Sequence, residues 1–271
     1  MSGTSDASER YLDLLGYRSL QGARLVRDMT AFALITLGVV LSRFGVSRRV
    51  VHPLLFAQVR QAGLRLLPMS VFLGVTVGLV IIGQTVALLS RVGAVSLVGT
   101  VLVTVVIREL GPLLTAIVVL ARAGTSNVVE LGMMRATGEV SALESLGIDP
   151  IHYLVMPRML GLAVSVFCLA TYFVLAAILS GLVFAFLQDV PLRPAAYFGR
   201  LGDALRWQDF VLFGLKTTFF GCVIAVVSCY HGLARPLRLE EISAVTERAV
   251  VEGVVGCVLL DALFLVGYMF L

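Results

Sequence analysis

The chain has 271 residues, of which 59% are hydrophobic and 14% are charged, and its mean hydropathy is +0.98. A soluble domain carries about a quarter charged residues, so these values exclude a soluble protein and predict that most of the chain is surrounded by lipid. The net charge of +4 comes almost entirely from arginine, because Lys216 is the single lysine. No basic stripe with interleaved aromatic residues is present, so we expect no nucleic-acid partner.

The first 49 residues form a region distinct from the rest of the chain. Residues 1–23 are polar and lack the apolar core and cleavage site of a signal peptide. Ala31–Leu41 is uncharged but too short to cross a bilayer, which takes about 20 residues. The arginines on both sides of this stretch favour a helix lying in the membrane interface over residues 24–42, and a short span is the alternative.

The second region, residues 50–271, contains five apolar runs that are long enough to cross a bilayer. These runs cover residues 66–90, 94–121, 159–187, 208–232 and 249–271. In the first run, Gly74, Gly78 and Gly83 are spaced so that another helix backbone can approach closely. The predicted fold class is therefore an all-α integral membrane protein with an N-terminal interfacial helix and five transmembrane helices.

The distribution of arginine predicts how the chain is oriented in the membrane. Nine arginines precede the first apolar run, whereas only Arg91 lies between the first and second runs. Positively charged segments stay in the cytoplasm, so the N-terminus is predicted to be cytoplasmic and the C-terminus periplasmic. The polar loop at residues 122–158 then lies in the cytoplasm.

This loop contains an amphipathic pattern over residues 127–146, which predicts one continuous helix. Its apolar residues recur at steps of three and four: Val129, Met133, Ala136, Val140 and Leu143. Arg135 is expected to pair with Glu139 one turn later. Gly147 suits a left-handed helix end, and Asp149–Pro150 suits the start of the next helix. Periodicity alone leaves two interpretations open, a docking helix and a helix packed along the membrane surface.

Several motifs occur in order around this loop. They are R-E-L-G-P at 108–112, A-R-A-G at 121–124, E-L-G-M-M-R-A-T at 130–137 and L-G-I-D-P at 146–150, preceded by L-L-F-A-Q-V-R-Q-A-G at 54–63 and the Gly83–Gln84 pair. Together they resemble the MlaE (YrbE) family of ABC-transporter permeases over residues 50–271. One departure is Thr137–Gly138–Glu139, where T-E-Q is usual, and this change bears on the choice of ATPase.

The resemblance implies the membrane subunit of a machine that moves phospholipids between the inner and outer membranes of Gram-negative bacteria. Implied partners are a cytoplasmic ABC ATPase, a periplasmic MCE-domain protein, a second copy of the chain and phospholipid; a small STAS-domain protein is also compatible. The loop helix becomes the coupling helix between spans two and three. Its expected docking residues are Glu130, Met133, Met134, Arg135, Glu139, Val140 and Leu143.

Charged residues inside the apolar runs are the second candidate site. Arg108 and Glu109 lie between the uncharged stretches 94–107 and 110–121, where each charge costs about 3 kcal/mol. Adjacent residues point in different directions on a helix, so Lys216 in the fourth run is the predicted partner of Glu109. That pairing would leave Arg108 for an anion such as a lipid phosphate. The alternative is a structural cluster that fixes helix register.

The resemblance places this cluster beside the lipid pocket. The expected substrate-binding residues are therefore Gln84, Arg108, Glu109, Lys216 and Asp261. We expect no catalytic residues and no cofactor in the chain itself, because no G-x-x-x-x-G-K-[ST] motif occurs and ATP would be bound by the partner. The histidines lack ligands at fixed spacing, so no metal site is expected.

Two other functions remain as alternatives to a transport subunit of the bacterial inner membrane. An intramembrane lipid-modifying enzyme would use Glu109, Lys216 and Asp261 as acid and base groups. An ion-coupled carrier is disfavoured by the small number of spans and the lack of an internal repeat.

Overall fold

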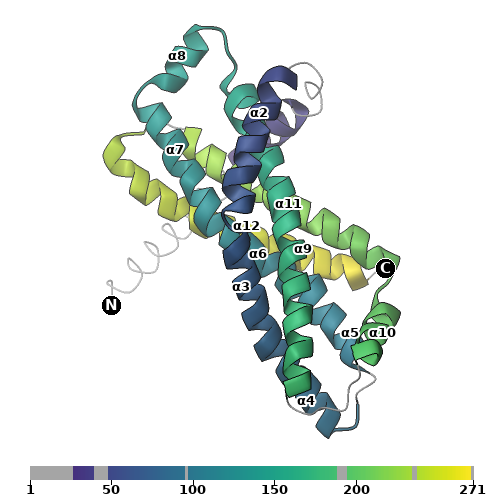
Figure 1. Ribbon diagram of the computed structural model, residues 1–271. Helices are drawn as coiled ribbons and strands as arrows, with labels where there is room; N and C mark the ends of the chain where they lie inside the picture. Colours follow the sequence, from purple (N-terminus) through teal and green to yellow (C-terminus); the bar gives the residue numbers. More distant parts are fainter. Residues whose placement is uncertain (1–26, 40–47, 95–96, 188–193, 234–236, 270–271) are drawn as a thin grey trace, which may run out of the picture.

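The computed structural model describes residues 27–39, 48–94, 97–187, 194–233 and 237–269 (Figure 1). The predicted polar segment at residues 1–23 lies outside them. Within these residues every regular element is helical, and five helical segments are long and apolar enough to cross a membrane. They are Pro53–Arg91, Val98–Ala136, Ile151–Phe184, Trp207–Leu233 and Leu239–Tyr268. The prediction of an all-α membrane protein with five spans is confirmed.

The first two spans alternate between α-helix and wider π-helical turns. The first consists of α2 (Arg48–Val59), η1 (Arg60–Leu64), α3 (Leu67–Val77), η2 (Gly78–Ile82) and α4 (Gly83–Arg91). The second consists of α5 (Val98–Leu102), η4 (Val103–Leu110), α6 (Gly111–Val119), η5 (Leu120–Gly124) and α7 (Thr125–Ala136). π-Helical turns are rare and occur often at functional sites. In the second span, η4 carries both Arg108 and Glu109.

The remaining three spans have longer uninterrupted helices. After α8 (Glu139–Ser145), the chain continues through η6 (Ile151–Val155), α9 (Met156–Leu187), α10 (Pro194–Ala204), α11 (Trp207–Leu233), η7 (Leu239–Glu241) and α12 (Ile242–Met269). Helix α9 packs against α2, α3, α6 and α11 and is therefore the central helix of the molecule. Helix α12 packs mainly on α11 and α7.

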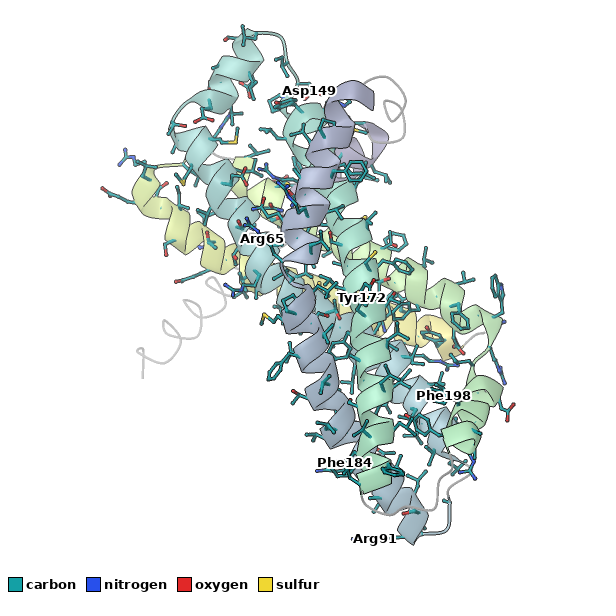
Figure 2. The ribbon with its side chains drawn as sticks, in the orientation of Figure 1. Arg65, Arg91, Asp149, Tyr172, Phe184 and Phe198 are labelled. Atoms are coloured by element: carbon teal, nitrogen blue, oxygen red, sulfur yellow. The ribbon has the colours of Figure 1, made fainter. Side chains whose placement is uncertain are left out.

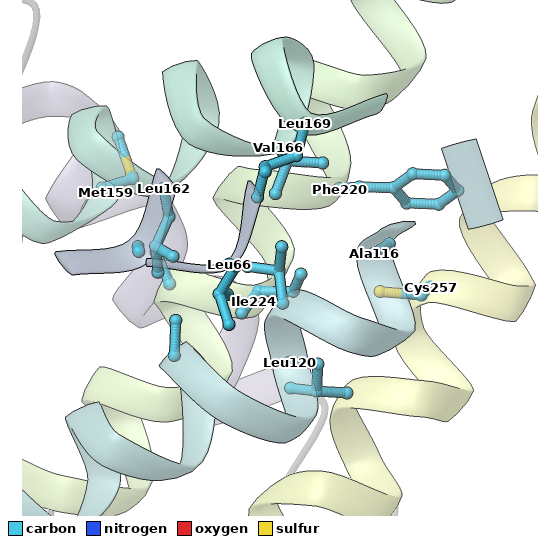
Figure 3. Close-up of a cluster of buried hydrophobic side chains, with 14 of the residues drawn as sticks. Leu66, Ala116, Leu120, Met159, Leu162, Val166, Leu169, Phe220, Ile224 and Cys257 are labelled. Atoms are coloured by element: carbon cyan, nitrogen blue, oxygen red, sulfur yellow. The ribbon is translucent and has the colours of Figure 1, made fainter. Parts of the chain in front are cut away.

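A buried apolar cluster lies where these helices cross (Figure 3). Its residues come from all five spans and include Leu66, Ala116, Leu120, Met159, Leu162, Val166, Leu169, Phe220, Ile224 and Cys257. Lipid tails are as apolar as these side chains, so close packing rather than the hydrophobic effect holds the helices together here. Cys257 is a free thiol buried in this cluster and acts as a small apolar residue.

Glycine allows the close approach of span one to α9. A Cβ atom added at Gly74 would lie 2.5 Å from the carbonyl oxygen of Phe173, and one added at Gly78 would overlap the Ala177 carbonyl and the Ser180 hydroxyl. At Gly83 it would meet the ring of Phe184. The predicted role of these glycines in close backbone contact is confirmed, and the partner is a helix of the same chain.

The N-terminal helix and the loop lie at one end of the molecule. Residues 27–39 are helical, as expected for part of the N-terminal helix, and Phe32 contacts Tyr230 at the end of α11 with ring centroids 5.8 Å apart. Figure 1 shows α8 at this end, and α4, α5 and α10 at the opposite end. The position of residues 27–39 in the membrane interface stays a prediction.

The loop departs from the predicted single helix over residues 127–146. Helix α7 ends at Ala136 and α8 begins at Glu139, because Gly138 adopts a left-handed conformation with φ of 81°. Glycine tolerates this conformation because it has no Cβ atom. Gly147 also has positive φ (75°), and Asp149 Oδ1 accepts a 3.0 Å hydrogen bond from the backbone N–H of Ile151, so the predicted corner is confirmed.

Candidate functional site

Lys216 is the centre of a charge cluster between spans two, four and five. Its side chain is fully buried (0% exposed), and its Nζ donates to the Arg108 carbonyl at 2.8 Å and to Glu109 Oε2 at 2.9 Å. Asp261 Oδ1 lies 2.7 Å from the same nitrogen. The Lys216 ammonium group therefore makes two hydrogen bonds and one further ion-pair contact, since Asp261 Oδ1 forms no hydrogen bond within the described residues. The predicted pairing of Glu109 with Lys216 is confirmed, and Asp261 joins it.

The R-E-L-G-P motif explains why Lys216 reaches a backbone carbonyl. Pro112 has no N–H, so it cannot bond to the carbonyl four residues earlier, which belongs to Arg108. Lys216 donates to that carbonyl instead. A Cβ atom at Gly111 would lie 2.6 Å from Val174, so this glycine lets α6 pack closely on α9. The motif therefore both frees a carbonyl and fixes the helix that carries Glu109.

Arg108 is paired with a residue that the sequence analysis missed. Its Nη2 lies 2.7 Å from Oδ1 of Asp209, which is only 2% exposed. The second oxygen of Asp209 accepts a 2.9 Å hydrogen bond from the backbone N–H of Arg206, the residue directly before α11. The expectation that pairing leaves Arg108 as an unpaired cation is wrong, because three carboxylates rather than two face the two cations.

A signal for Asp209 was present in the sequence. Asp209 precedes Lys216 by seven residues, which is two helical turns, so both side chains lie on one face of α11. Asp261 and Tyr268 have the same spacing on α12, and the Arg108 guanidinium lies 5.0 Å from the centre of the Tyr268 ring. In spans four and five, a spacing of seven residues thus marks the helix face that lines the cluster.

One side of the cluster remains open. Arg108, Glu109 and Asp261 are 26%, 25% and 16% exposed, whereas Lys216 and Asp209 are buried. The Nε of Arg108 is buried and has no hydrogen-bond partner among the described residues. Chemically, the open side offers the accessible part of one guanidinium, flanked by two carboxylates and an aromatic ring.

Gln84 does not take part in any of these contacts. It is exposed on α4 and lines a cavity of about 230 Å³ together with Ala87, Leu88, Arg91 and Phe184. Figure 2 shows Arg91 and Phe184 at the end of the molecule opposite to Asp149 of the loop. Of the five predicted substrate-binding residues, the structure therefore brings four together and leaves Gln84 apart.

The predicted docking residues of the loop separate into buried and exposed groups. Val140 is 2% exposed and, with Met134 and Leu143, packs against a small core around Leu131 and Val155. Val140 therefore does not present its side chain to a partner. Met133, in contrast, is 49% exposed on α7.

The charged residues of the loop form ion pairs within the chain. Glu130 pairs with Arg158 of α9 at 2.9 Å, and this contact ties α7 to span three. Arg135 pairs with Glu144 at 3.3 Å rather than with Glu139 as predicted, because the turn at Gly138 changes the direction of α8. Glu139 is exposed and accepts a hydrogen bond from Thr137.

Comparison with known proteins finds one matching family model and several related proteins. The family model described as Permease MlaE matches residues 55–266. A probable ABC transporter permease protein of Rickettsia prowazekii is 28% identical over 89% of this chain and 90% of its own length. The intermembrane phospholipid transport system permease protein MlaE of Haemophilus influenzae is 28% identical over 74% of this chain and 77% of its own. The chloroplastic protein TRIGALACTOSYLDIACYLGLYCEROL 1 of Arabidopsis thaliana is 30% identical over 75% of this chain and 58% of its own.

Proposed function

Because the chain belongs to the MlaE permease family, we propose that it is the membrane subunit of an ABC transporter that moves phospholipids or related lipids. The transfer runs between the inner membrane and a periplasmic MCE-domain protein and serves lipid homeostasis of the outer membrane. The matched residues 55–266 include nearly all of the five spans, and a relative in Haemophilus influenzae carries the name of an intermembrane phospholipid transport permease. This family match is the observation that carries the proposal.

The charge cluster supports a polar lipid headgroup as ligand. Arg108 is partly exposed in the second span although its Nη2 is paired with Asp209, so a phosphate oxygen would be a strong acceptor for its accessible N–H groups. Lys216 is less suited to this role, because it is fully buried and is held by two hydrogen bonds and an ion-pair contact with Asp261. We therefore assign headgroup binding to Arg108 with Glu109 and Asp261 beside it, and a positioning role to Lys216. Gln84 would contact the lipid at a separate place.

The loop is the proposed docking element for a cytoplasmic ABC ATPase. Met133 and Leu146 are exposed apolar side chains at 49% and 73%, and a groove on a partner would cover them. Exposed Glu139 and the Arg135–Glu144 pair lie on the same connection. This side of the membrane would be cytoplasmic, with a cytoplasmic N-terminus and a periplasmic C-terminus.

The proposed assembly contains a second copy of the chain and can include a small STAS-domain protein. Helix α12 belongs to the least buried of the five spans. It exposes the apolar side chains of Val255, Leu259, Leu263 and Val266. A second copy packed there would cover part of this surface and place two charge clusters around one cavity.

The geometry disfavours the alternative of an intramembrane lipid-modifying enzyme. A general base needs an accessible group that can accept a proton from the substrate. Lys216 is fully buried and donates to its surroundings, so it does not reach a substrate atom. The cluster is better suited to binding than to acid–base chemistry.

The test is to purify the complex in detergent and identify its subunits and lipids by mass spectrometry. We expect an ABC ATPase, an MCE-domain protein and phospholipid to co-purify. The double variant Arg108→Gln/Asp209→Asn removes both members of one ion pair, so no buried charge is left unpaired; it should assemble but hold several-fold less lipid. Arg248→Gln, an exposed position at the other end of α12, is the control. A purified complex without an ATPase would contradict the proposal.

A further inference from the structure

A second polar cavity lies on the loop side of the molecule, apart from the charge cluster. It has a volume of about 300 Å³ and lies between the α2–η1 part of span one and the η5–α7 part of span two. Its polar lining residues are Gln58, Gln61, Arg65, Arg122, Ser126 and Asn127. None of the residues of the charge cluster lines it.

The cavity has a positive charge that is not neutralised by its own walls. Arg65 and Arg122 line it, and none of the described residues that line it is a carboxylate. In the described part of the chain neither arginine forms an ion pair. The nearest acidic residue along α7, Glu130, is already paired with Arg158. Two guanidinium groups at one cavity are a setting for an oxyanion, because each presents a planar set of N–H donors.

The wall also contains a buried donor without an acceptor. Asn127 is 2% exposed, and its Oδ1 accepts a 3.3 Å hydrogen bond from Gln58 Nε2. Its Nδ2 has no hydrogen-bond partner in the part of the chain that the structure describes. Buried polar groups in native proteins are nearly always hydrogen-bonded, and an exception calls for a missing acceptor such as a ligand oxygen or water. An oxyanion in this cavity would supply that acceptor.

The position of the cavity matches the depth of lipid headgroups. Arg65 directly precedes the uncharged stretch 66–90, and Arg122 directly follows the uncharged stretch 110–121. Arginines at such boundaries lie at the membrane interface. Figure 2 places Arg65 on the loop side of Tyr172, away from Arg91 at the other end of the same span. Ala62, Leu66 and Ala123 add apolar walls next to the polar ones.

We propose that this cavity binds the headgroup phosphate of an anionic phospholipid from the leaflet on the loop side. Phosphate oxygens accept hydrogen bonds from Arg65, Arg122 and Asn127, and the acyl chains extend along the apolar wall into the bilayer. Because the walls belong to span one and to the segment leading into α7, the bound lipid links span one to the loop. Free phosphate offers the same oxygens, so the test separates the two sources.

The test uses the full-length chain with its co-purifying subunits in nanodiscs of phosphatidylcholine containing a minority of phosphatidylglycerol. Native mass spectrometry counts the phosphatidylglycerol molecules retained. We expect Arg65→Gln/Arg122→Gln to retain several-fold less than the wild type. Arg60→Gln is the matched control, because it removes an exposed arginine of the same segment that does not line the cavity. Both variants should show the thermal unfolding transition of the wild type.

Three outcomes would overturn the inference. The first is equal phosphatidylglycerol retention in the double variant and the wild type. The second is an equal loss in Arg60→Gln, which would indicate general surface charge. The third is displacement of the lipid by inorganic phosphate, which would identify a free-anion site. The Arg108→Gln/Asp209→Asn variant should retain the lipid here, so failure of the transport proposal leaves this result unchanged.

Discussion

The charge cluster and the loop both contain ion pairs, but the pairs differ in how deeply their side chains are buried and in their length. In the cluster, Lys216 and Asp209 are 0% and 2% exposed and the ion pairs are 2.7 to 2.9 Å long. In the loop, Arg135 and Glu144 are 24% and 52% exposed and lie 3.3 Å apart. An ion pair is stronger and a lone charge more costly where water is excluded, so each buried charge needs a partner. The exposed Arg135–Glu144 pair of the loop has no such requirement, because water solvates either charge without its partner.

The largest effect should follow from removal of Lys216. Lys216→Met leaves Glu109 and Asp261 as unpaired neighbours and the Arg108 carbonyl without its donor. Breaking a buried ion pair costs about 3–5 kcal/mol, so we expect a much lower unfolding temperature in detergent or little folded protein. Thr218→Ala is the control, since its hydroxyl only bonds within α11. Wild-type stability of Lys216→Met would show that the pairs contribute nothing.

Exchanging Glu109 and Lys216 tests whether these two residues act as an isolated ion pair or together with Asp261. If Glu109 and Lys216 only neutralised each other, the exchanged variant Glu109→Lys/Lys216→Glu should fold normally. We expect it to fail, because the new carboxylate would lie beside Asp261, which contacts residue 216 at 2.7 Å in the native protein. Adding Asp261→Asn should restore part of the lost thermal stability. Full recovery without that third change would contradict the three-way contact.

A packing change at the contact between span one and α9 should have the next largest effect. Gly78→Leu would force a side chain into the Ala177 carbonyl and Ser180, and overpacking costs about 1–3 kcal/mol or more. We expect a lower yield of monodisperse complex in size-exclusion chromatography. Gly202→Leu in α10 is the control, because no atom of the described residues lies within 4 Å of a Cβ there. Equal yields of Gly78→Leu and Gly202→Leu would contradict a requirement for close contact between span one and α9 at Gly78.

In the loop, a substitution should change binding rather than folding. Met133→Asp places a charge on an exposed position, so the protein should insert normally and lose the ATPase in a pull-down. Leu143→Asp is less specific, because Leu143 packs against the small core around Leu131 and would also affect the fold. Unchanged ATPase recovery with Met133→Asp would show that the partner docks elsewhere.

The smallest effect should come from the exposed ion pair of the loop. In a double-mutant cycle with Arg135→Ala and Glu144→Ala, we expect a coupling energy below about 1 kcal/mol, because exposed pairs gain little in water. Thermal unfolding of the four proteins measures it. A coupling energy of about 3–5 kcal/mol, the cost of breaking a buried ion pair, would contradict the proposed difference between the exposed pair and the buried cluster.

The sequence by itself determined the class of fold and the number of spans. Apolar run length is enough for this, because a helix must be about 20 residues long to cross the bilayer. It also predicted the pairing of Glu109 with Lys216, since a charge in lipid needs a partner and this chain has a single lysine. The turn at Gly147 and the start of the next helix at Asp149 followed from local backbone chemistry.

Only the tertiary structure decided which charges meet. Asp209 lies far from Arg108 in the sequence, and the packing of α11 beside η4 brings them within 2.7 Å. Likewise, helical periodicity predicted one helix over 127–146, but the left-handed backbone at Gly138 divides it and buries Val140. The cavity with Arg65 and Arg122 joins two spans, so no single segment contains it. Contacts between segments depend on helix packing, which a linear pattern does not specify.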